Sequence, residues 1–158
     1  MRKAAALIFT FATIAATPAA TQAASPGEDA LVKQGRYVVQ IAGCNDCHTP
    51  GYGQAEGRVD EALWLTGDNV GWSGPWGTTY AANLRLYMAN HSEASWLKVS
   101  RSFKPRPPMP WFNVHAMRDS DLRALYHYIR RLGPAGAPVP AYLPPGKKPQ
   151  GPVIQFPG

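Results

Sequence analysis

The clearest pattern of apolar and polar positions lies near the end of the chain, between residues 119 and 132. Apolar side chains recur there three or four positions apart, as on the buried face of an amphipathic helix: Leu122, Leu125, Tyr126 and Ile129. Two aspartates open the segment, two arginines close it and Gly133-Pro134 follows, which suits the helix dipole and stops the helix. The pattern predicts an α-helix over residues 119–132.

Two weaker patterns predict helices earlier in the chain. Residues 27–42 place small and branched side chains on one face: Val32, Gly35, Val39 and Ala42. Because Gly35 has no side chain, another element can approach this helix closely. A shorter helix is predicted to begin after Ser92, a good N-cap, with Glu93 in its first turn.

The remaining segments predict loops. Residues 50–83 are rich in glycine and aromatic residues and show little of the alternation typical of strands, with at most one helical turn near residues 60–65. Prolines in residues 104–110, "KPRPPMP", exclude regular structure. Eight prolines among residues 133–158 predict an extended tail, which either packs on its own domain or clasps a partner subunit.

The N-terminus has the layout of a secretory signal peptide. Arg2 and Lys3 precede an apolar run over residues 4–16, and small residues follow. The run is shorter than the roughly 20 residues needed to span a bilayer, so we expect a periplasmic protein that meets a membrane only through a partner. An uncleaved N-terminal anchor is the alternative. Three parts are predicted: a signal peptide over residues 1–24, one domain over 25–132 and the tail over 133–158.

Charge adds a limited constraint on partners. The chain has 16 Lys+Arg and 10 Asp+Glu, a net charge of +6. Removal of residues 1–24 leaves 14 basic and 10 acidic residues, a net charge of +4. No stripe of Lys and Arg is present, so we expect no nucleic-acid binding.

The only two cysteines, Cys44 and Cys47, stand three positions apart, and His48 follows at once. This spacing matches the C-x-x-C-H attachment site of c-type haem, in which two thiols on one turn bond to the porphyrin and the histidine binds iron. A thioredoxin-like pair would need a βαβ setting, and structural zinc would need four ligands. The sequence therefore predicts one covalent haem c on Cys44, Cys47 and His48.

Around this motif the chain resembles the class I c-type cytochromes. The similarity covers residues 28–132 through three segments: "GRYVVQIAGCNDCHTP", "GPWGTTYAANL" and "PPMPWFNVHAMRDSDLRALYHYIRRL". It is especially close to the haem domains that serve as cytochrome subunits of bacterial membrane-linked dehydrogenases. The resemblance implies an all-α, cytochrome c-like fold around one haem. Its first and last helices would cross near Gly35, Val39, Leu125 and Tyr128.

An iron bound by His48 needs a second axial ligand, and Met109 is the leading candidate. Three prolines frame it rigidly: Pro107, Pro108 and Pro110. Family members typically carry such a Met-Pro pair shortly before the last helix. Met117 is the main alternative, although it also has the spacing of a hydrophobic staple with Leu122. Met88, a histidine or an open site are further alternatives.

Other residues are candidates for roles around the haem. The resemblance places three possible partners of a propionate beside it: Trp76, Tyr80 and Asn83. The carbonyl of Pro75 or Pro50 is a candidate acceptor for the ring nitrogen of His48 that does not bind iron. The other histidines are expected to be structural or solvated: His91, His115 and His127.

With both axial positions filled by protein groups, iron has no place for a substrate, so we expect a one-electron carrier without a small-molecule substrate. The expected partners are redox proteins: a dehydrogenase as donor and a cytochrome or oxidase as acceptor. Basic residues near the methionine are candidates to steer an acidic partner: Lys98, Arg101, Lys104 and Arg106. The alternatives are a haem enzyme or gas sensor with a labile sixth position, and thiol-disulfide exchange.

Overall fold

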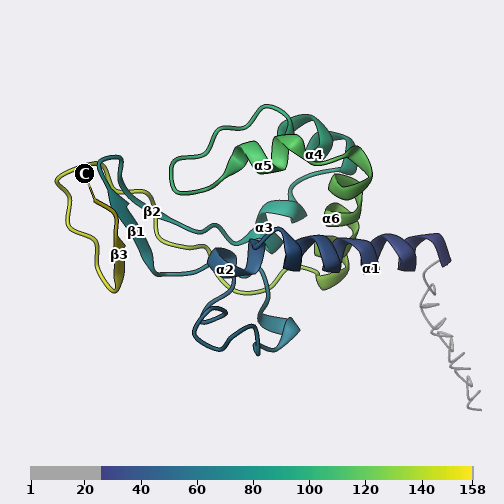
Figure 1. The fold of residues 1–158 in the computed structure, drawn as a ribbon, viewed down its shortest axis with the longest axis horizontal. Helices are drawn as coiled ribbons and strands as arrows, with labels where there is room; N and C mark the ends of the chain where they lie inside the picture. The colour runs from purple at the N-terminus through teal and green to yellow at the C-terminus, as the bar shows by residue number, and fades with distance from the viewer. Residues whose placement is uncertain (1–25, 158) are drawn as a thin grey trace, which may run out of the picture.

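The computed structural model describes residues 26–157, so the signal peptide predicted over residues 1–24 lies outside the described part of the chain. Helices gather at one end of the molecule and a small sheet stands at the other (Figure 1). The elements are α1 (Pro26–Ile41), α2 (Cys44–His48), η1 (Glu61–Leu63), β1 (Gly71–Gly74), β2 (Gly77–Tyr80), α3 (Leu84–Ala89), α4 (Glu93–Ser100), α5 (Trp111–Ala116), α6 (Asp119–Leu132) and β3 (Val153–Gln155). Within residues 26–157, no helix combines the length and apolar character needed to cross a membrane.

Helices α1 and α6 cross in close contact (Figure 1). A Cβ placed on Gly35 would lie 2.0 Å from the carbonyl oxygen of Ala124 and 2.6 Å from the Cβ of Tyr128. The absence of a side chain at Gly35 is therefore what lets the two backbones approach this closely. This contact confirms the helix crossing that the resemblance implied near Gly35 and Tyr128.

The apolar core lies among α1, α3, α4 and α6. Its buried side chains are Val38, Val39, Trp64, Leu65, Met88, Trp96, Leu122, Leu125, Tyr128 and Ile129. The indole of Trp96 donates a hydrogen bond of 2.8 Å to the carbonyl of Leu122, which ties α4 to α6. Arg85 is also buried, and its guanidinium donates to the carbonyls of Leu132 and Gly133. It thus caps the end of α6 that carries the partial negative charge of the helix.

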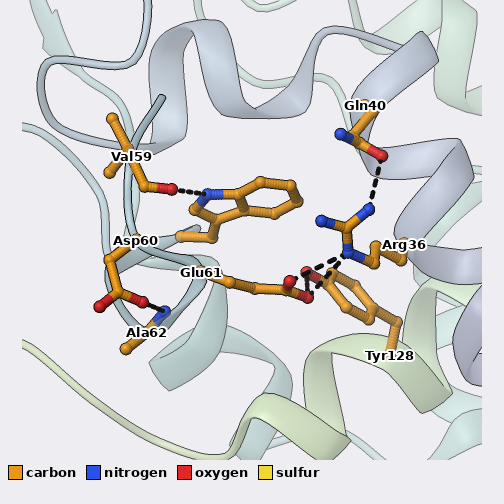
Figure 2. Close-up of polar contacts among 8 residues, drawn as sticks. Arg36, Gln40, Val59, Asp60, Glu61, Ala62 and Tyr128 are labelled. Carbon is orange, nitrogen blue, oxygen red and sulfur yellow. Dashed lines mark hydrogen bonds and ion pairs between the residues drawn. The ribbon is translucent and has the colours of Figure 1, made fainter. Parts of the chain in front are cut away.

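A cluster of three polar side chains, Arg36, Glu61 and Tyr128, joins α1, η1 and α6 (Figure 2). The Nε of Arg36 donates to both carboxylate oxygens of Glu61, at 3.1 and 3.0 Å, and the guanidinium lies 4.9 Å from the ring centroid of Trp64. The hydroxyl of Tyr128 donates to the same carboxylate at 2.7 Å. The Arg36–Glu61 pair is partly exposed and contributes little by itself, so the buried phenol is the stronger of the two attachments to Glu61.

Replacing Tyr128 by phenylalanine is expected to lower the free energy of unfolding by about 1–2 kcal/mol at neutral pH, because a hydrogen bond to a charged acceptor is lost. Burial first, and then the bond to Glu61, raise the pKa of Tyr128. A raised pKa in the folded state stabilises the fold below the ordinary tyrosine value of about 10, and this contribution is lost as the pH rises further. The difference in the free energy of unfolding between wild type and Tyr128→Phe, measured by chemical denaturation, should therefore shrink above about pH 10. Tyr37→Phe, at an exposed position of α1, is the control, and a difference that stays constant with pH would contradict the assignment.

A three-stranded sheet occupies part of the region where the sequence predicts loops. Strands β1 and β2 form an antiparallel hairpin, and β3 of the tail pairs parallel to β1, with Ile154 opposite Trp72. The prediction of no strands here is wrong because each strand has only three or four residues, too few to show alternation, and the partner of β1 lies far along the chain. The helical turn predicted near residues 60–65 is confirmed by η1.

The proline-rich tail packs on the domain itself. Thr78 and Leu143 exchange two backbone hydrogen bonds, of 2.8 and 3.0 Å. The ring centroid of Phe156 lies 6.0 Å from that of Trp72 and 5.4 Å from that of Trp76. Of the two arrangements considered for the tail, the described residues show packing against its own domain.

The predicted long helices are confirmed, and two short helices were missed. α6 has the predicted bounds, α1 begins and ends one residue earlier than predicted, and α4 begins after Ser92, whose hydroxyl accepts from the amide of Ser95. α3 and α5 have six residues each, so neither is long enough to show a helical period. A local signal for α3 exists in Asn83, whose Oδ1 accepts from the amide of Leu86.

Candidate functional site

The three predicted attachment residues lie together on α2: Cys44, Cys47 and His48. Gly43, with a φ of 67°, makes the left-handed turn that separates α2 from α1. At the other end, the hydroxyl of Thr49 donates to Asn45 Oδ1 at 2.7 Å and accepts from the amide of Leu65 at 2.8 Å. The turn at Gly43 and the contacts of Thr49 thus define where α2 begins and ends.

The two thiols are free and half-buried. Burial raises the pKa of Cys44 to about 11, with a smaller contribution from the negative charge of Asp46. Burial also raises the pKa of Cys47. A cysteine that exchanges disulfides needs the opposite, a lowered pKa that yields the thiolate. The pair is therefore poorly suited to thiol-disulfide exchange, whereas neutral thioethers suit these surroundings.

The ring of His48 is buried and is oriented by one hydrogen bond. Its Nδ1 lies 2.7 Å from the carbonyl oxygen of Ala82, so Nδ1 carries the proton and donates it. Burial lowers the pKa of His48, with the Ala82 carbonyl acting in the opposite direction, and the ring is accordingly neutral. This tautomer leaves the lone pair of Nε2 for a metal. The acceptors proposed from the sequence, Pro75 and Pro50, are wrong, because the loop after β2 brings Ala82 to the ring instead.

Two of the candidate methionines belong to the apolar core and one does not. Met88 is 1% exposed within the core, and Met117 packs against it one residue before Arg118, the N-cap of α6. This places Met117 in the staple position relative to Leu122. Met109 is half-buried in the loop between α4 and α5 and lies outside the core cluster. The ligation of iron by Met109 together with His48 stays a prediction.

The other histidines have structural partners. The ring of His91 is tilted against that of Tyr87, with ring centroids 4.6 Å apart. His115 of α5 bonds through Nε2 to the carbonyl of Phe103 at 2.9 Å. His127 bonds through Nε2 to a carboxylate oxygen of Glu93 at 2.9 Å. These contacts favour the structural roles expected for all three.

Two of the three candidate propionate partners are engaged elsewhere. The side-chain amide of Asn83 donates to the carbonyls of Ala135 and Ala137, and its oxygen caps α3. The indole of Trp76 donates to the carbonyl of Trp72 at 3.3 Å. Among the three, Tyr80 keeps the hydroxyl that could serve such a contact.

No zinc-like cluster exists in the described chain: among residues 26–157, no three His, Cys, Asp or Glu side chains gather to hold a metal ion. A comparison with protein families identifies the family, because the family model described as cytochrome c matches residues 32–133. The chain belongs to the cytochrome c family. The comparisons with curated proteins and with solved structures found no match. Cytochromes c bind covalent haem c and carry electrons, and the mostly helical fold of this chain agrees with that membership.

The residues present fit the cofactor of this cytochrome family. Cys44 and Cys47 would form the thioethers, and His48 would offer Nε2 to iron, with its ring orientation set by Ala82. When bound, the haem supplies an iron that gains and loses one electron. The sequence motif was sufficient to find the side chains, but a backbone acceptor such as Ala82 leaves no residue-type signal.

Proposed function

We propose that this cytochrome c is a periplasmic one-electron carrier whose haem is ligated by His48 and Met109. It would pass electrons from a dehydrogenase to a cytochrome or oxidase of the respiratory chain, as a free carrier or as a cytochrome subunit. The observation that carries the ligand assignment is the use of the methionines: the core takes up Met88 and Met117, whereas the proline-framed Met109 is left outside it.

The chain's own residues would serve electron transfer by holding the ligands still. The Ala82 carbonyl fixes the tautomer and rotation of His48. The prolines around Met109 limit the conformations of its loop. A site whose ligands change little between the two oxidation states needs little rearrangement for each electron, and it offers iron no open position for a substrate.

The surface near Met109 supports a brief encounter with a redox partner. Phe112 is 58% exposed on α5, and the exposed Lys104 places its Nζ 5.5 Å from the ring centroid of the neighbouring Trp111. Lys98 is an exposed basic residue of α4. Arg101 is less suited to steering than the sequence indicates, because it pairs with Asp119. An exposed aromatic side chain together with exposed basic residues suits weak and rapid association with an acidic partner. Gel filtration of a native extract, followed at the haem absorbance, separates the free carrier from the subunit of a larger complex.

The loading experiment tests the cofactor and its ligation together. Protein produced with a cytochrome c maturation system is expected to carry the mass of one haem on the processed chain and to give a low-spin spectrum. The variant with Cys44→Ser and Cys47→Ser is expected to lose the covalent haem entirely, because no thioether can form. A colourless wild-type product with two free thiols contradicts the proposal. Rapid binding of carbon monoxide by the ferrous wild type would favour the haem enzyme or gas sensor instead.

A further inference from the structure

The segment over residues 103–110, called here the methionine loop, depends on other parts of the chain for its position. Prolines occupy four of its eight positions: Pro105, Pro107, Pro108 and Pro110. A proline has no amide hydrogen, so these positions cannot donate backbone hydrogen bonds that would hold the loop in place. Contacts from neighbouring elements therefore have a larger share in fixing Met109 than they would in an ordinary loop.

The first such contact comes from the hairpin. Thr79 of β2 donates a hydrogen bond from its hydroxyl to the carbonyl of Pro107, and the oxygen atoms lie 2.7 Å apart. Pro107 is two residues before Met109. The neighbouring strand residue, Thr78, is itself held by its two backbone hydrogen bonds with Leu143 of the tail.

The second contact comes from the tail. The guanidinium carbon of Arg106 lies 3.8 Å from the ring centroid of Tyr142, which is a close cation–π contact. The hydroxyl of Tyr142 donates to the carbonyl of Trp76 at 2.9 Å, so the ring is fixed on the hairpin turn. The loop is thus held at two successive residues, Arg106 and Pro107, by groups that come from outside it.

The tail can hold the loop because the tail is itself anchored. Strand β3 adds to the sheet beside β1, and the amide of Phe156 donates to the carbonyl of Ser73 at 2.8 Å. Gly77 permits the tail to pass close to the hairpin: a Cβ there would lie 2.2 Å from the carbonyl oxygen of Leu143. Loop, hairpin and tail therefore form one connected unit of three segments that are distant in the sequence.

We propose that Thr79 and Tyr142 are positioning residues for Met109, and that the C-terminal tail sets how firmly this methionine occupies the sixth position of the iron. The proposal rests on the ligation by Met109 proposed above. A loop that is free to swing away competes with ligation, so each lost contact increases the fraction of protein whose thioether is detached. The tail then acts on the stability of the Met109–iron bond without touching the haem.

Competition with free imidazole measures this fraction, because imidazole binds ferric iron only where Met109 has left it. Thr79→Val removes the hydroxyl and Tyr142→Leu removes the ring. Each variant is expected to bind imidazole about twofold to tenfold more tightly than wild type, in proportion to the lost contact. Thr79→Ser keeps the hydroxyl and should restore wild-type affinity, while Tyr142→Phe keeps the ring and should lie between Tyr142→Leu and wild type.

Arg106→Leu breaks the cation–π contact from the loop side, so it tests the proposal even if a tail variant folds poorly. Combined with Tyr142→Leu it should bind imidazole no more tightly than Tyr142→Leu alone, since that variant has already lost the cation–π contact. Glu93→Gln, which weakens the link between α4 and α6, is the control for a general loss of stability and should leave imidazole affinity unchanged.

Two outcomes distinguish failure of the positioning role from failure of the ligand assignment. Wild-type imidazole affinity in both Thr79→Val and Arg106→Leu overturns the positioning role, while the ligand assignment stands if Met109→Ala still abolishes the charge-transfer band between methionine sulfur and ferric iron. Retention of that band in Met109→Ala overturns the ligand assignment and the positioning role together.

Discussion

Replacing Met109 by alanine is expected to abolish the far-red charge-transfer band of the ferric protein and to lower its reduction potential by on the order of 0.2 V, within the range of about 0.8 V that axial ligands span. A thioether is a soft, weakly basic ligand that favours ferrous iron, so its loss favours the ferric state. The ferrous variant should also bind carbon monoxide, because the sixth position is then open or weakly held. Absorption spectra during a redox titration measure both effects.

Met117→Ala is the matched control for this experiment. Met117 packs against the core at the start of α6, so its truncation should lower the free energy of unfolding by about 1–2 kcal/mol. The band and the potential should stay close to those of wild type. The reverse pattern, with the band lost only in Met117→Ala, would show that Met117 is the ligand.

Gly35→Ala is expected to lower the free energy of unfolding by at least about 2 kcal/mol. The added Cβ would lie 2.0 Å from the carbonyl oxygen of Ala124 and 2.6 Å from the Cβ of Tyr128, so α1 and α6 would have to separate. This cost outweighs the gain of up to about 1 kcal/mol that alanine brings to a helix interior. Chemical denaturation followed by circular dichroism in the far ultraviolet measures the difference.

Gly27→Ala, in the same helix, is the control for Gly35→Ala. A Cβ at Gly27 meets nothing within 4 Å, so only the helix propensity changes and the fold should become slightly more stable. If both substitutions changed the free energy of unfolding equally, α1 and α6 would not be in close contact at Gly35.

Most of the correct predictions came from two kinds of pattern: an apolar period that continues over several helical turns, and a motif with fixed spacing. The helix over residues 119–132 showed its apolar face across several turns, and the structure has the same bounds for α6. The motif of Cys44, Cys47 and His48 lies within five consecutive residues, so one turn of helix is enough to bring the three side chains together. These features depend on local geometry, which neighbouring residues determine.

The sheet and the contacts around the site depend on residues that are distant in the chain. β1 pairs with a tail strand of three residues, and Thr79 reaches Pro107 only because the hairpin and the methionine loop meet. No local pattern marks these partners, since each segment is too short to have a period and the contacts use backbone carbonyls. The same reason explains why Ala82 was not identified as the acceptor for His48.

The sequence by itself determined the attachment motif, the long helices and the close approach permitted at Gly35, because each follows from residue type and spacing along one segment. Only the tertiary structure decided that the tail packs on its own domain, that Met88 and Met117 serve the core, and that Ala82 orients His48. Those features depend on which surfaces come into contact when the whole chain folds. The segments in contact are distant in the sequence, and no local pattern in one segment predicts its partner.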